Sequence, residues 1–180
     1  MLTLDLGQSR VGRLWLNEVP EFHCQNTNYF LKDFALINTK KIYNNCVAFE
    51  YCNLPGHSSY YALLGVKFDP DNDNLIKIRI HAVSNSQSTY SKTLSLWKNE
   101  VFWGIPEEYA NAIAEATKST ITNLGGFPSG TLDFSVGAHD LVGSSNAIFS
   151  KVTKLLINIM VQKTEALSIE QLKNKITEIV

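Results

Sequence analysis

The first half of the chain alternates apolar and polar residues with a period of two, the pattern of half-buried β-strands. The clearest run covers residues 75–82, where isoleucines alternate with Lys77, Arg79 and His81. This arrangement is typical of a sheet with one solvent-facing side. Further strands are predicted at residues 2–6, 14–16, 34–37, 46–52 and 60–68, with one or two more within residues 94–103.

In the second half the apolar spacing changes to that of helices. Pro106 suits a first helical turn, and Tyr109, Ile113 and Ile121 follow at helical intervals up to Gly125. A strand at residues 131–136 then precedes a helix at residues 145–162 and a last helix at residues 168–179. A run of strands followed by helix, strand, helix and helix predicts an α+β fold.

Composition narrows the function classes. The chain has 180 residues, 18% of them charged, and a net charge of −1. It therefore has no overall positive field to attract nucleic acid, and RNA binding would need a local basic patch. The odd number of cysteines, three, and the lack of a signal sequence favour a cytoplasmic location, and no apolar run is long enough for a membrane span.

A histidine, an aspartate and two serines lie together in residues 137–149. His139, Asp140 and either Ser144 or Ser145 could form the base, orienting group and nucleophile of a hydrolase. The segment lacks the second glycine of a G-x-S-x-G nucleophile elbow, however. The alternative interpretation is a strand-to-helix loop in which Ser144 or Ser145 caps the helix.

Metal and nucleotide sites are not predicted. No C-x-x-C pair joins Cys24, Cys46 or Cys52, and the acidic turn at residues 69–74 lacks the glycine and glutamate of a calcium loop. No phosphate-binding glycine motif opens a helix. We therefore expect no cofactor, no metal and no bound nucleotide.

Several short motifs of the second half resemble those of a known family. In order, they are Ile105-Pro106-Glu107-Glu108-Tyr109, Gly126-Phe127-Pro128, and Gly137 with Ser144, Ser145 and Phe149. They resemble the I-P-x-E-Y, G-Y-P and G-x-x-H-x-V-x-S-S-x-x-x-F landmarks of domain IV of translation elongation factor G. The resemblance runs from about residue 53 to residue 161, and residues 1–45 have no counterpart in it.

The resemblance implies a ribosomal protein S5 domain 2-like fold for residues 46–180. This fold is a mixed four-stranded sheet backed by two helices, with a left-handed β-α-β crossover. Residues 1–45 would be a strand-rich N-terminal extension packed on this domain, and a short helix would follow at the C-terminal end. No GTP-binding domain accompanies it, so the chain would be a free-standing module.

In that family, two loops at one end of the domain form a tip that enters the ribosomal decoding site. By position these loops are residues 53–60 and 137–144 here. The candidate binding residues are His57, Ser58, Ser59, Tyr60, His139 and Asp140, which we expect to be exposed. The family's arginine-containing glycine loop is replaced by Gly56-His57-Ser58-Ser59-Tyr60.

We therefore expect a non-catalytic binding module that contacts a ribosome, RNA or a protein through these two loops, without catalytic residues. One alternative is a protein-interaction, regulatory or immunity-type protein with no ribosomal role, which the near-neutral charge favours. Another is a hydrolase that uses His139 as its base.

Overall fold

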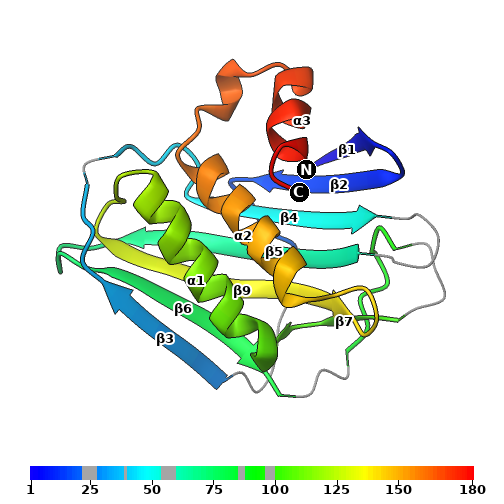
Figure 1. The fold of residues 1–180 in the computed structure, drawn as a ribbon, viewed down its shortest axis with the longest axis horizontal. Helices are drawn as coiled ribbons and strands as arrows, with labels where there is room; N and C mark the ends of the chain where they lie inside the picture. Colours follow the sequence, from blue (N-terminus) through cyan, green and yellow to red (C-terminus); the bar gives the residue numbers. More distant parts are fainter. Residues whose placement is uncertain (22–27, 39, 54–59, 85–87, 96–99) are drawn as a thin grey trace.

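The computed structural model describes residues 1–21, 28–38, 40–53, 60–84, 88–95 and 100–180. They form a mixed sheet with helices in front of one face (Figure 1). The elements in chain order are β1 (Leu2–Gly7), β2 (Arg10–Leu16), β3 (Asn28–Phe34), β4 (Cys46–Asn53), β5 (Tyr60–Pro70), β6 (Ile76–Val83), β7 (Val101–Trp103), β8 (Ile105–Pro106), α1 (Glu107–Asn123), β9 (Gly130–Asp140), α2 (Asn146–Met160), a 3₁₀ turn (Thr164–Ala166) and α3 (Ile169–Thr177).

Within the described residues the sheet has nine strands in the order β1-β2-β4-β5-β9-β6-β3, with β7 paired to β9 and β8 paired to β6. The pairs β6–β9 and β6–β8 are parallel and the others antiparallel. The α+β class is confirmed, but the expected four strands are too few. The β1–β2 hairpin extends one edge and β3 the other, because their apolar side chains, such as Leu14 and Phe30, pack against the main core.

Helices α1 and α2 cover the middle of the sheet and pack against each other (Figure 1). Their apolar stripes meet at Tyr109 and Phe149, whose rings are stacked with centroids 4.7 Å apart. Both helices lie where the helical spacing predicts them, and Ser145 caps α2 by accepting from the amide of Ile148. No helix in the described part of the chain has the length and apolar character of a membrane span.

β8 passes unusually close to β9. The amide of Gly104 donates a 2.7 Å hydrogen bond to the carbonyl of Gly137. A Cβ atom at Gly137 would lie only 2.4 Å from Cγ1 of Ile105. This contact explains why residue 137 has no side chain.

The sheet face opposite the helices is divided in two. Over β2, β4 and β5 it carries a second apolar cluster, in which Tyr61 and Leu63 pack with Tyr90 and Val101 from the segment before α1. Over β6 the same face is polar and meets solvent, where Nε2 of His81 lies 2.8 Å from Asp133. The solvent-facing side predicted for residues 75–82 is confirmed.

Two strand predictions need correction. The strand predicted at residues 34–37 lies earlier, at Asn28–Phe34, because Phe30 and Phe34 pack on the core, whereas Ile37 makes an isolated bridge to Phe127. In the region predicted as residues 94–103, the described part forms the three-residue β7 at Val101–Trp103.

Candidate functional site

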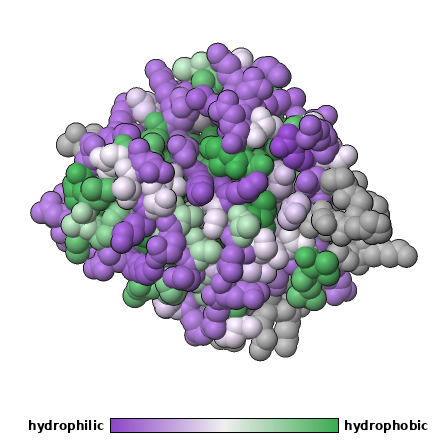
Figure 2. All heavy atoms as spheres, viewed as in Figure 1, coloured by the Kyte–Doolittle hydropathy of each residue, from purple (hydrophilic) through white to green (hydrophobic). Residues whose placement is uncertain are grey.

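The turn that joins β9 to α2 presents two consecutive aliphatic side chains to solvent. Leu141 is 74% exposed and Val142 is 77% exposed. Figure 2 shows a compact apolar patch at the right-hand side of the molecule, where Figure 1 places this turn. The coloured atoms next to the patch in this view are more hydrophilic.

The backbone of this turn is held by hydrogen bonds. Oδ1 of Asp140 accepts from the amides of Val142 at 2.7 Å and Gly143 at 3.1 Å. The hydroxyl of Ser144 accepts from the amide of Asp140 at 2.9 Å and donates to the carbonyl of Tyr61 at 2.7 Å. The amide of Tyr61 in turn donates to the carbonyl of Gly143. The turn is therefore held by hydrogen bonds among its own residues and by hydrogen bonds to Tyr61 of β5.

His139 and Asp140 were expected to be exposed at this tip, and that expectation is wrong. They are 8% and 1% exposed. β9 continues to Asp140 instead of ending near residue 136, because β7 pairs with its last residues, placing Val101 opposite Asp140 and Phe102 opposite His139. The exposed positions move two residues along the chain, to Leu141 and Val142.

The three side chains considered for a hydrolase, those of His139, Asp140 and Ser144, each form hydrogen bonds with main-chain groups. Nδ1 of His139 lies 3.2 Å from the carbonyl of Gly104 and must donate to it, since a carbonyl only accepts. Burial lowers the pKa of His139, opposed by that hydrogen bond. Asp140 binds turn amides and Ser144 donates to a carbonyl. Across the described residues, no hydrogen bond links the side chains of His139, Asp140 and Ser144 to one another.

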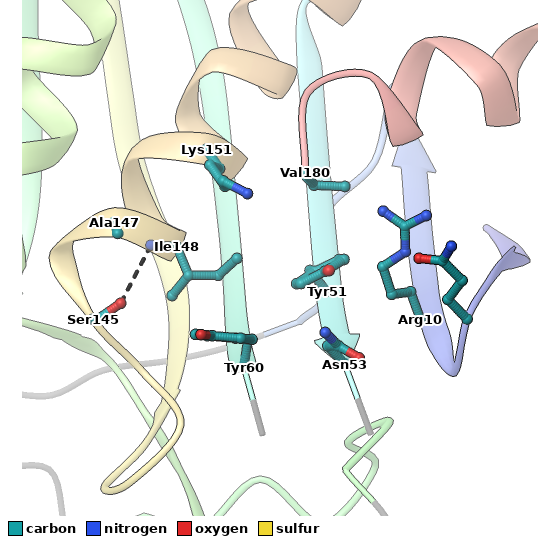
Figure 3. Close-up of a pocket in the computed structure, with 10 residues that line it drawn as sticks. Arg10, Tyr51, Asn53, Tyr60, Ser145, Ala147, Ile148, Lys151 and Val180 are labelled. Carbon is teal, nitrogen blue, oxygen red and sulfur yellow. Dashed lines mark hydrogen bonds between the residues drawn. The ribbon is translucent and has the colours of Figure 1, made fainter. Parts of the chain in front are cut away.

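The structure describes only the two end residues, Asn53 and Tyr60, of the other candidate loop, residues 53–60. His57, Ser58 and Ser59 lie outside the described residues. Tyr60 is the first residue of β5 and is 47% exposed. It lines an open pocket of about 370 Å³ together with side chains from β2, β4 and α2 (Figure 3).

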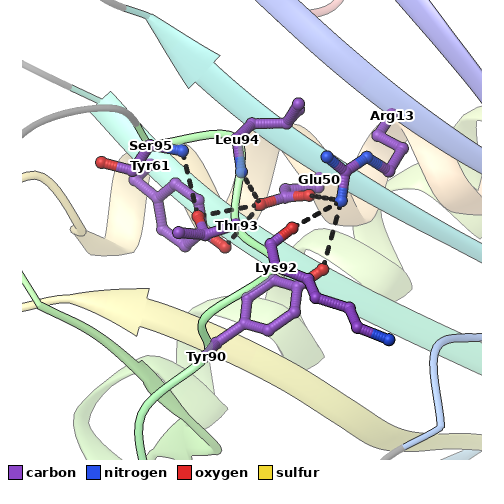
Figure 4. Close-up of polar contacts among 8 residues, drawn as sticks. All are labelled: Arg13, Glu50, Tyr61, Tyr90, Lys92, Thr93, Leu94 and Ser95. Carbon is purple, nitrogen blue, oxygen red and sulfur yellow. Dashed lines mark hydrogen bonds and ion pairs between the residues drawn. The ribbon is translucent and has the colours of Figure 1, made fainter.

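The sequence analysis missed a buried carboxylate, Glu50, in the middle of β4. Its side chain has no exposed surface, and Oε1 accepts from Tyr61 Oη at 2.9 Å, Thr93 Oγ1 at 3.1 Å and the amide of Leu94 at 2.8 Å (Figure 4). Nη1 of Arg13, opposite it on β2, lies 3.2 Å from Oε2. A glutamate within the apolar run of residues 47–52 was the available signal, because a charge in such a strand needs a partner.

This network fastens the segment before α1 to the sheet. Nη1 of Arg13 also donates to Tyr90 Oη at 3.3 Å and to the carbonyl of Lys92 at 2.8 Å. Burial raises the pKa of Glu50, opposed by its hydrogen bonds to Leu94 and Tyr61 and by Arg13. Burial, followed by the charge of Glu50, raises the pKa of Tyr90 to about 12, so its phenol stays protonated. We interpret the network as a structural clamp on the second apolar cluster.

The cysteines are poor metal ligands in this fold. Burial, followed by Glu50 and Asp140, raises the pKa of Cys52 to about 12, so the thiolate that metals prefer is disfavoured. Burial also raises the pKa of Cys46. Among the residues that the structure describes, no group of three or more His, Cys, Asp or Glu side chains is placed to hold a metal ion. His23 and Cys24 lie outside those residues.

Comparison with known proteins does not assign a family. No protein-family model matches the chain, and a search of curated proteins finds no match. The function must therefore be argued from the geometry of the turn and of the surfaces beside it.

Proposed function

We propose that the protein is a non-catalytic binding module that docks a partner protein through the β9–α2 turn. The observation that carries this proposal is the exposure of Leu141 and Val142, at 74% and 77%, on a turn held by hydrogen bonds from Asp140 and Ser144. Single exposed apolar residues are ordinary, but two adjacent ones on a fixed turn are a preorganised apolar contact. Preorganisation lowers the ordering cost of binding.

The chemistry of the tip favours protein over RNA. Leucine and valine side chains gain free energy by entering an apolar pocket, whereas RNA offers phosphates, ribose hydroxyls and stacked bases. RNA-binding tips rely on cations and aromatic rings. The charged side chain of the turn, Asp140, is buried and turned toward its own backbone. The complementary surface is therefore an apolar pocket on a protein.

The S5-like arrangement expected from the resemblance is part of this proposal. Two features support it. β6 and β9 are parallel neighbours connected through α1. In Figure 1, α1 lies in front of the sheet and both strands point to the right. β9 lies above β6 in this view, so the crossover from β6 through α1 to β9 is left-handed.

The resemblance makes the ribosome the first partner to test. The end of the first loop that it assigns to the tip, at Tyr60, lies beside the β9–α2 turn, because the neighbouring Tyr61 is bonded to Gly143 and Ser144. His57, Ser58 and Ser59 remain predicted contact residues of the same tip. A fold analogy alone does not assign function, so a ribosomal protein enters the experiment as one defined candidate.

The test compares partner binding by three forms of the chain. Wild type, the double variant Leu141→Ser/Val142→Ser and the control Ile169→Ser are used as bait for purified ribosomes and for an extract of the source cells. Ile169 is 59% exposed at the start of α3, so its substitution removes a similar apolar surface elsewhere. We expect the double variant to lose at least about tenfold in affinity, since each buried aliphatic side chain contributes about 1.5–3 kcal/mol.

Thermal unfolding of all three forms serves as the folding control, and we expect unchanged midpoints because the substituted side chains are exposed. A partner that the double variant binds as tightly as wild type does not use the turn. If every captured partner behaves in that way, the proposal is wrong.

A further inference from the structure

The pocket beside Tyr60 is built by a row of side chains across three strands. Arg10 of β2 stands opposite Asn53 of β4, and Asn53 stands opposite Tyr60 of β5. Residues directly opposite one another in a sheet point to the same face. The row therefore forms the floor of the pocket, and Lys151 and Ile148 of α2 contribute to its wall (Figure 3).

The charged side chains of this pocket are both cationic. Among the described residues, Arg10 and Lys151 line it and no aspartate or glutamate side chain does. Neither cation makes an ion pair within the described residues. The Arg10 guanidinium donates long hydrogen bonds to main-chain carbonyls, 3.3 Å to Gly7 and 3.4 Å to Leu6, and it also interacts with the Tyr51 phenol. In the view of Figure 3 the Arg10 and Lys151 side chains lie on either side of Val180, and both line the pocket, so each would attract an anion bound there.

Neutral donors accompany the cations. Tyr51 and Tyr60 both line the pocket. Burial raises the pKa of Tyr51, opposed by Arg10, so its phenol remains a donor. α2 begins at this wall and has no acidic residue in its first turn, so the partial positive charge of its N-terminus adds to the same field.

We propose that this pocket binds the phosphate monoester group of a small molecule, with Arg10 and Lys151 as its charged ligands. A phosphate monoester carries up to two negative charges near neutral pH, which matches the two cations that line this pocket. The volume of about 370 Å³ falls in the range of small-molecule sites. Tyr60, with 47% of its surface exposed, offers a ring on which a base can stack, so nucleoside monophosphates fit best.

A nucleic-acid strand fits less well. Its backbone phosphates carry one charge each and require a track of cations, whereas the chain as a whole has a net charge of −1. The site also differs from the docking turn, because its ligating residues lie on β2, β5 and α2 and exclude Leu141 and Val142. The two proposals can therefore fail independently.

Calorimetric titration of the untagged chain with adenosine 5′-monophosphate, inorganic phosphate and adenosine tests the proposal. The untagged form is used so that no tag residue adds charge near the pocket. We expect the monophosphate to bind at least about tenfold more tightly than adenosine, since charge-assisted hydrogen bonds are the strong ones. Its affinity should fall as ionic strength rises.

Arg10→Gln and Lys151→Gln should each weaken binding of the monophosphate at least about tenfold. Lys154→Gln is the matched control, because it removes the same charge from an exposed position on α2 outside the pocket, and we expect its affinity to stay within about twofold. Tyr60→Ser should abolish the preference for adenosine monophosphate over inorganic phosphate. Thermal unfolding confirms that each variant is folded.

Three results would overturn the proposal. One is the absence of heat from both phosphate ligands at millimolar concentration and low salt. Another is equal weakening by Lys151→Gln and Lys154→Gln, which would indicate a general surface charge effect. The third is tighter binding of a short RNA than of the monophosphate with the same dependence on Arg10, which would indicate a polymer site.

Discussion

The hydroxyl of Ser144 donates a 2.7 Å hydrogen bond to the main-chain carbonyl of Tyr61, joining the β9–α2 turn to the first residues of β5. The same hydroxyl accepts from the amide of Asp140. Ser144→Ala leaves both main-chain groups without this partner, so we expect a loss of about 1–3 kcal/mol in the free energy of unfolding. Urea denaturation measures it.

Ser91→Ala is the matched control for Ser144→Ala. Ser91 lies in an exposed turn, so its substitution should change stability by less than about 0.5 kcal/mol. If the two variants are equally stable, the Ser144 hydroxyl does not hold the turn, and the rigidity assigned to Leu141 and Val142 loses its basis.

Gly137 is expected to tolerate no side chain. The Cβ of Gly137→Ala would lie 2.4 Å from Cγ1 of Ile105, and the overlap should cost about 1–3 kcal/mol of stability. Ile105→Ala removes the clashing atoms but leaves a cavity at a buried position. The double variant should therefore be more stable than the sum of the two single losses predicts. Strict additivity in a denaturation cycle would show that the two residues do not meet.

Local sequence patterns predict the helices and strands that have strong periodicity. They fail where pairing with a distant segment decides which side chains are buried. The helical stripe that begins near Phe149 and the alternation around Arg79 depend on neighbouring residues, and both were predicted correctly. The burial of His139 depends on pairing with Phe102, far earlier in the chain. No local pattern indicates that pairing.

The candidate binding surfaces also combine features that local patterns predict with features that depend on distant segments. The sequence patterns indicated the β9–α2 loop but not the exposed residues within it. The pairing of β7 with the end of β9 buries His139 and Asp140 and leaves Leu141 and Val142 in solvent. The pocket residues Arg10 and Lys151 belong to elements at opposite ends of the chain. They line one pocket because β2 pairs with β4, next to the strands that α2 covers, and composition cannot reveal that pairing.

The burial of His139 predicts a dependence of stability on acid. Burial lowers the pKa of its ring below the ordinary 6.5, so the folded protein favours the neutral form. As pH falls through 6.5, the unfolded chain takes up a proton first, and stability that is fully present above this pH is lost toward the folded-state pKa. We expect the free energy of unfolding to fall more between pH 7 and pH 5 in wild type than in His139→Gln. An NMR titration that gives His139 a pKa above 6.5 would contradict this.

Arg13 and Glu50 test how the second apolar cluster is fastened. Arg13→Met leaves the carboxylate of Glu50, which has no exposed surface, without its counter-charge, and we expect a loss of about 3–5 kcal/mol at pH 7. Because burial already raises the pKa of Glu50, the variant should recover part of that loss as pH is lowered and the carboxyl takes up a proton. Urea denaturation at several pH values measures both effects.

The double variant Arg13→Met/Glu50→Gln separates the charge from the hydrogen bonds. A glutamine oxygen can still accept from Tyr61, Thr93 and Leu94, so the double variant keeps the bonds that hold the segment before α1 and removes both buried charges. We expect it to be more stable than Arg13→Met alone. A double variant no more stable than the single one would mean that the unpaired carboxylate is not the cause of the loss in Arg13→Met.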